Sequence, residues 1–105
     1  MAHWTLVTYT RPQVLTDWYS PTAEVVSKID EWKNTDPKKI EHYEVKESDD
    51  GLKQFYKIGF KDTDTSLAFL DESAAQSNET ARNAHCESTG ITAVVNQYGE
   101  NEPIL

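Results

Sequence analysis

Apolar and polar residues alternate, or β-branched and aromatic residues accumulate, along four segments of the chain, and such patterns are typical of β-strands. The four segments run from His3 to Thr10, from Lys39 to Glu47, from Leu52 to Lys61 and from Ile91 to Tyr98. The middle two are separated by Ser-Asp-Asp-Gly, residues 48–51, and its Asp-Gly pair suits the positive φ of a hairpin turn. The sequence therefore predicts four strands, two of them joined as a hairpin.

A hydrophobic stripe at helical spacing follows the first strand, and it consists of Val25, Val26, Ile29 and Trp32. Ser20 is suited to cap this helix, and Pro21 is suited to its first position, where a missing N–H costs nothing. The helix should end by about residue 35, ahead of Asp36-Pro37. Just before it, Trp18 and Tyr19 are expected to fold back on the helix start, the alternative being that they rim a pocket.

A second helical region starts near Asp62 and reaches about Glu87, with large apolar residues only near its beginning. Leu67, Phe69 and Leu70 are expected to pack inward. The sequence predicts a break between residues 72 and 76, and a left-handed Gly90 that ends the helix. Gly59, alone in the third strand, is expected to mark a bulge or close packing.

The order of the predicted elements is strand, helix, strand, strand, helix, strand. Because crossovers within one sheet are right-handed, the simplest arrangement is a ferredoxin-like α+β sandwich. Four antiparallel strands would then carry both helices on one face, in a single domain over residues 1–105, with residues 99–105 as a tail expected to fray.

Both faces of the predicted sheet carry apolar residues, although helices would cover only one of them. We expect the other face to be covered by a second copy of the chain, so that two sheets form a barrel. The alternative is an exposed face with some apolar residues. The residues expected at this homodimer interface are Val7, Tyr9, Phe55, Val94 and Tyr98.

The chain also resembles a known group of proteins. The opening WTLVTYTRP, the capped helix, the DDG hairpin, the segment FKDTDTSLAFLDE and the GI before the last strand are similar to small dimeric α+β barrel proteins of ferredoxin-like fold. In the order of elements and the pattern of residues, the chain resembles especially short uncharacterised proteins of this type from marine phages and environmental sequence. The resemblance implies a homodimer with a space between sheet and helices, but no particular function, because relatives include small monooxygenases, dehydratase-like and stress-related proteins.

Composition narrows the possible partners. Eighteen acidic and ten basic residues give a formal net charge of −8, which disfavours direct binding to a nucleic-acid backbone. No apolar run is long enough to span a bilayer, and the N-terminus has no signal-peptide pattern. The single cysteine cannot form an intrachain disulfide. We therefore expect a cytoplasmic protein, in the host cell if a phage encodes it, that does not bind membranes.

His85 and Cys86 are the first candidates for chemistry. Neighbouring helical residues point about 100° apart, and the negative end of the helix dipole disfavours a thiolate. A histidine beside a packed cysteine at a helix end is therefore the better interpretation. The three histidines show no metal-ligand spacing, and no cofactor motif is present, so we predict no metal, no cofactor and no catalytic residue.

Five residues are candidates for a pocket between sheet and helices: Trp4, Tyr9, His42, Tyr56 and His85. The first functional hypothesis is a non-enzymatic module that binds a partner or a small apolar ligand. The second is a cofactor-independent enzyme that acts on a small hydrophobic or aromatic molecule, with His42 or His85 as base. The third is an acidic mimic of nucleic acid that inhibits an enzyme, which rests on the net charge alone.

Overall fold

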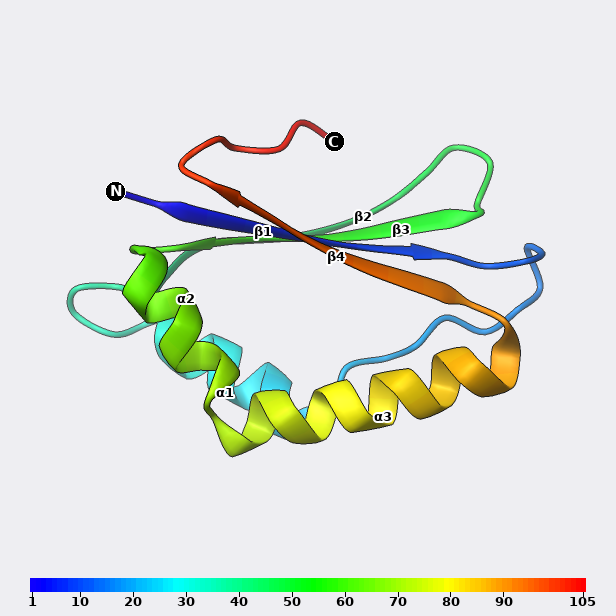
Figure 1. The fold of residues 1–105 in the computed structure, drawn as a ribbon, viewed down its shortest axis with the longest axis horizontal. Coiled ribbons are helices and arrows are strands. Elements are labelled where there is room, and N and C mark those ends of the chain that lie inside the picture. The colour runs from blue at the N-terminus through cyan, green and yellow to red at the C-terminus, as the bar shows by residue number, and fades with distance from the viewer.

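The structure, a computed structural model, describes all 105 residues, and three helices cover one face of a four-stranded antiparallel sheet (Figure 1). The strands are β1 (His3–Thr10), β2 (Ile40–Glu47), β3 (Lys53–Phe60) and β4 (Thr92–Gly99), and the helices are α1 (Ala23–Lys33), α2 (Thr63–Leu70) and α3 (Ser73–Thr89). The spatial order of the strands is β2-β3-β1-β4, with every neighbouring pair antiparallel. This order confirms the predicted ferredoxin-like arrangement.

The turns and the ends of the helices lie at or near the positions that the sequence predicted. Gly51 in the β2–β3 hairpin has a φ of 73°, and Gly90 ends α3 with a φ of 79°. The predicted second helix is two helices, interrupted at residues 71–72. The predicted cap of α1 was wrong: Thr22 caps the helix in place of Ser20, because the Thr22 hydroxyl accepts the N–H of Val25 at 3.2 Å.

The register of the sheet decides which side chains face the helices. In β1 these are His3, Thr5, Val7 and Tyr9, and Val7 pairs with Tyr56 of β3 and Val95 of β4 on the same side. Val7 and Tyr9 were expected at the interface on the opposite face, and this was wrong, although Tyr9 was also expected in the cavity. Both faces of β1 are apolar, so alternation alone could not say which one the helices cover.

Two groups of buried side chains hold the helices on the sheet. The larger one consists of Val25, Ile29, Trp32, Ile40, Phe60 and Phe69, and the smaller one of Tyr9, Tyr19, Cys86 and Ile91. Three residues expected to pack inward do not: Val26, Leu67 and Leu70 are between 43% and 55% exposed. The apolar stripe of α1 is therefore narrower than predicted, and α2 buries Phe69 as its single large apolar side chain.

The face of the sheet opposite the helices, called the free face below, is partly covered by the chain's own C-terminal tail, which folds back over it (Figure 1). Lys57, only 6% exposed, places its ammonium group 2.5 Å from Glu102 of the tail and 5.1 Å from the centre of the Trp4 ring. Pro103 is buried. The segment predicted to fray is thus fastened to the sheet at this point. None of the three helices combines the length and the apolar character that crossing a membrane requires.

Candidate functional site

A cavity of about 470 Å³ lies between the sheet and the helices, within the size range of small-molecule sites. The sheet forms its floor, with Val7, Ile58 and Phe60 among the apolar contributors, and α1 adds Val25 and Ile29. Most of its lining is apolar. Because α2 and α3 meet at an angle and β4 lies at the edge of the sheet, the helices do not close over the space (Figure 1).

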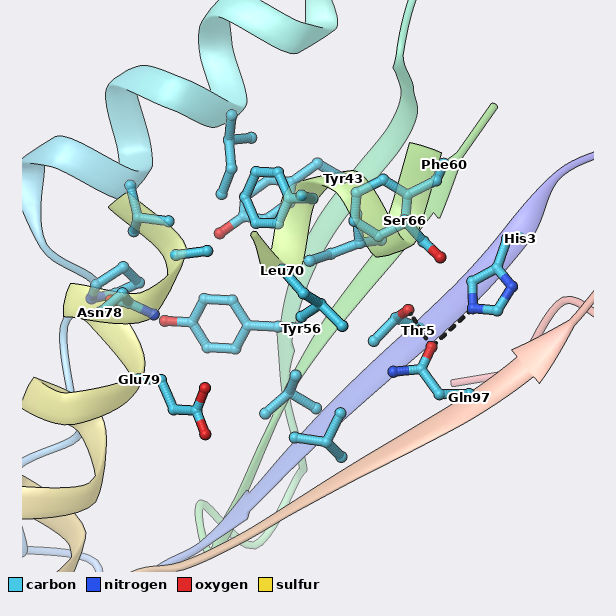
Figure 2. A pocket seen from close by; sticks show the side chains of 18 of the residues that line it. His3, Thr5, Tyr43, Tyr56, Phe60, Ser66, Leu70, Asn78, Glu79 and Gln97 are labelled. Carbon is cyan, nitrogen blue, oxygen red and sulfur yellow. Dashed lines mark hydrogen bonds between the residues drawn. The ribbon is translucent and has the colours of Figure 1, made fainter. Parts of the chain in front are cut away.

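Three tyrosines stand in this cavity, and Figure 2 shows Tyr43 and Tyr56 projecting from the sheet across it. Tyr56 makes edge contacts with Tyr9 and Tyr43, at ring-centre distances of 5.6 and 6.3 Å. None of the three hydroxyls has a hydrogen-bond partner within the chain, and none is sealed from the open space. Burial raises the pKa of all three, that of Tyr43 to about 12, so they are neutral hydrogen-bond donors.

One end of the cavity carries a hydrogen-bonded network around His3. The Gln97 amide of β4 extends toward Thr5 and His3 of β1 (Figure 2), and its Oε1 lies 2.7 Å from both the Thr5 hydroxyl and His3 Nε2. Since an amide oxygen only accepts, both of these groups donate to it. His3 Nδ1 lies 3.2 Å from the hydroxyl of Thr63 at the start of α2, and in the neutral ring it accepts from that hydroxyl.

Helix α3 supplies the other end of the cavity with Asn78, Glu79 and Arg82. The Asn78 side chain also fastens the loop before α1, because its Oδ1 accepts the Tyr19 hydroxyl at 2.7 Å and the Thr22 N–H at 3.1 Å. Tyr19 therefore packs against α3 and Tyr9 of β1 and does not staple the start of α1 as the sequence predicted. The two ends of the cavity differ in composition, since its lining carboxylate and its lining guanidinium are both at the α3 end.

The mouth of the cavity has an apolar rim. Leu67 and Leu70 of α2 are about half exposed, at 55% and 54%, and Val95 of β4 is 44% exposed. Apolar side chains at an opening reduce the cost of admitting an apolar molecule, because they contact it on entry. Leu67 and Leu70 were predicted to pack inward, and they are half exposed because they border the opening of the cavity.

Comparison with known proteins identifies the fold. No protein-family model matches the chain, and no curated protein matches it. A protein of Deinococcus radiodurans, provisionally named an antibiotic biosynthesis monooxygenase, superposes with a TM-score of 0.59 at 12% identity, over 98% of this chain and 96% of its own. Rv0793 of Mycobacterium tuberculosis superposes with a TM-score of 0.60 at 12% identity, over 96% of this chain and 97% of its own. The chain shares their fold.

The structure brings together only two of the five predicted pocket residues, Tyr9 and Tyr56. Trp4 and His42 lie on the free face, where their rings meet edge to face at 5.5 Å, and His42 Nε2 lies 3.3 Å from Glu44. Their assignment to the cavity was wrong, because Trp4 and His42 both pair with Gly59 on the side of the sheet that the helices leave open. His85 lies outside the cavity as well.

His85 and Cys86 do not form a catalytic pair. His85 Nε2 donates to the backbone carbonyl of Asp17 at 2.8 Å, and its ring packs on Tyr19 at 5.7 Å. Cys86 is buried in the smaller core group, and burial raises the pKa of its thiol. The thiolate is therefore disfavoured, and the histidine fastens the loop before α1 to α3, as the interpretation of a helix end predicted.

His3 is the one histidine on the cavity wall, and the sequence analysis did not select it. The available signal was its spacing, because His3 shares the parity of Thr5, Val7 and Tyr9 along β1. Both of its ring nitrogens are occupied by protein partners, so it is held as a polar wall group. No group of three or more His, Cys, Asp or Glu side chains is placed to hold a metal ion.

Proposed function

We propose that the chain binds a small, largely apolar molecule in the cavity between its sheet and helices. The observation that carries this proposal is a set of three phenol hydroxyls, from Tyr9, Tyr43 and Tyr56, that reach an apolar space of about 470 Å³ without a partner in the chain. Leaving polar groups unpaired in a buried setting has a cost, and a bound molecule with acceptor atoms removes it. Apolar walls with a few convergent polar groups are the usual composition of a ligand site.

A cavity-filling variant tests this proposal. Ala75 lines the cavity from α3, so Ala75→Phe should occupy part of it, whereas Ala84→Phe adds the same ring at an exposed position of the same helix. Titration with a neutral naphthalene methanol, followed by chemical-shift changes of the tyrosine rings, should show saturable binding by the wild type and by A84F. Binding by A75F should be at least tenfold weaker. Equal binding by both variants would contradict the proposed site.

Catalysis in the same cavity is the alternative, and the name of the Deinococcus radiodurans neighbour is what favours it. A proton-transfer step needs a base within reach of the substrate, and the cavity offers the His3 imidazole and the Glu79 carboxylate, which is 60% exposed. Because Gln97 and Thr63 engage both nitrogens of His3, binding is favoured over turnover. Oxygen consumption with hydroxylated aromatic compounds, compared between the wild type and His3→Gln, would reveal turnover.

We propose also that two chains associate through the free face. Val94 is 45% exposed on this face, in one row with Thr8 of β1 and Phe55 of β3, while Tyr98 at the bulge of β4 is 38% exposed. The tail around Glu102 covers another part of the face, so the interface would join the strip of β1, β3 and β4 that the tail leaves open. Light scattering at several concentrations should give a dimer for the wild type and a monomer for Val94→Asp. A monomeric wild type at micromolar concentration would contradict this proposal.

A further inference from the structure

Arg82 is an enclosed cation with weak partners. It lines the cavity from α3, and its side chain is only 16% exposed. The nearest carboxylate oxygen, on Glu79, lies 3.9 Å from Nη2, and the Asn83 side chain is 3.3 to 3.4 Å from Nη2 and Nε. A guanidinium has five N–H donors, and these contacts are long for hydrogen bonds to so many. An enclosed charge in this condition is costly unless another group compensates it.

The surroundings of Arg82 provide no better anion. Its charge reaches Tyr9, Tyr19 and Cys86, where it offsets part of the effect of burial on their pKa values. All three of these groups are neutral, because burial keeps their protons on. Glu79, the carboxylate at this end of the cavity, is 60% exposed, and Figure 2 shows it on α3 near Asn78. An exposed pair at this distance contributes little.

The two ends of the cavity therefore suit different parts of one molecule. At the α3 end, the guanidinium of Arg82 and the unpartnered hydroxyl of Tyr9 are both donors near the same space. At the other end, the network of His3, Thr5 and Gln97 contains no carboxylate, lysine or arginine. The walls between them are apolar and aromatic. A ligand with one anionic head and an apolar ring body complements this arrangement.

We infer that the cavity takes a ring-bearing carboxylate, whose carboxylate group is bound by Arg82 and the Tyr9 hydroxyl. This inference rests on the proposed function and names the class of its ligand. The opposite possibility is an organic ammonium ion held by the three tyrosine rings and Glu79, as in aromatic cages. It is disfavoured because the cation of the cavity is enclosed, while the carboxylate of Glu79 is mostly in solvent.

Three naphthalene probes that differ in one substituent test the inference: naphthalene carboxylate, naphthalene methanol and naphthalene methylamine. They are called the carboxylate, the methanol and the methylamine below. At pH 7.0 and constant salt, calorimetric titration of the wild type should rank the carboxylate first, about tenfold or more tighter than the methanol. The methylamine should bind weakest. If the methanol binds as tightly as the carboxylate, or the methylamine binds tightest, the inference of an anionic ligand is contradicted. The proposal that the cavity binds a small molecule would still hold. If no probe binds, the proposed function itself fails.

Variants at the α3 end separate a binding role of Arg82 from a structural one. Arg82→Gln should weaken the carboxylate about tenfold or more and leave the methanol within about twofold. Glu79→Gln removes the competing carboxylate, so it should strengthen carboxylate binding by about two- to fivefold. Lys38→Gln, at an exposed position outside the cavity, is the control for the change in net charge and should alter neither affinity.

Circular dichroism and thermal melting of each variant show that the fold is intact. Should Arg82→Gln unfold the chain, Glu79→Gln and Arg82→Lys keep the inference testable, because Arg82→Lys retains the charge and loses the planar donor group. That variant should keep a preference for the carboxylate over the methanol, at reduced affinity. A loss of methanol binding by R82Q equal to the loss of carboxylate binding would overturn the assignment of Arg82 to the anionic head.

Discussion

The indole ring of Trp4 lies against the backbone of Gly59 on the neighbouring strand, so closely that Gly59 has no room for a side chain. A Cβ at Gly59 would be 2.8 Å from Cζ3 of Trp4 and 3.1 Å from Cβ of His42. Strand β2 also changes register opposite this glycine, between Ile40 and His42. The lone glycine of the third strand therefore marks close packing, as its position in the sequence suggested.

Substitution of Gly59 by alanine should destabilise the protein by about 1–3 kcal/mol, because Trp4 or the strands must shift to admit the added methyl group. Urea unfolding at neutral pH measures this change. The double variant Trp4→Ala, Gly59→Ala is the control, since removal of the indole frees most of the space. If Gly59→Ala costs the same with and without Trp4, the contact with the indole is not the cause.

Phe69 and Leu67 lie two residues apart on α2, and their replacement by alanine should have different effects on stability and on binding. Phe69 is 7% exposed and packs on Trp32 and Phe60, at ring-centre distances of 5.1 and 5.6 Å, so Phe69→Ala should cost about 3–5 kcal/mol. Leu67 is 55% exposed at the mouth of the cavity, so Leu67→Ala should cost less than about 1 kcal/mol. It should nevertheless weaken binding of the naphthalene probes.

Thermal melting and probe titration of the same two variants give both measurements. A large loss of stability in Leu67→Ala would show that α2 depends on its rim leucines for folding. In that case the rim would be part of the core, and the mouth of the cavity would lie elsewhere.

Removal of the tail's carboxylate should destabilise the sheet. Glu102→Gln leaves the ammonium of Lys57, which is 6% exposed, without its 2.5 Å partner, and we expect a loss of about 1–2 kcal/mol by urea unfolding. The estimate is below that for a fully buried pair because Glu102 itself is 55% exposed. Lys57→Met in the Glu102→Gln background removes the stranded charge and should recover part of the loss. No recovery would mean that the tail stabilises the fold through Pro103 alone.

Stability should fall at alkaline pH through the cavity tyrosines. Burial, with smaller contributions from Tyr56 and Asp30, raises the pKa of Tyr43 to about 12, against about 10 in an unfolded chain. The folded chain therefore holds this proton more tightly, so stability is complete below about pH 10 and declines as the pH rises toward the folded value. Tyr43→Phe should make the alkaline decline less steep in urea unfolding. Equal pH slopes for Tyr43→Phe and the wild type would contradict a buried, neutral Tyr43.

Much of the fold could be predicted from local signals, because a turn or a helix end is determined by a few neighbouring residues. The Asp50-Gly51 turn, the stop at Gly90 and the β-branched and aromatic residues of β1 each act over a few neighbouring positions, and the structure confirms the three elements they predict. The cap of α1 was missed by two residues because Ser20 and Thr22 are both suitable caps, and the geometry of the following turn selects Thr22.

The site was harder to predict, because it depends on which face of the sheet the helices cover. With Trp4 and Leu6 on one side of β1 and Val7 and Tyr9 on the other, both faces read as apolar. Packing decides between them, and local sequence does not carry that information. The prediction therefore mixed residues of the two faces: it placed Trp4 and His42 in the cavity with Tyr9, and it left out His3, which is joined there to Gln97, far along the chain.

The hydrogen bonds of His3 and Gln97 have a consequence for the order of synthesis. They join the first strand to the last, across 94 positions of the chain. A nascent chain that has completed α3 still lacks this wall, because β4 follows α3 in the sequence. The cavity is therefore complete only after β4 has left the ribosome, and until then its apolar lining is open on the side of β4.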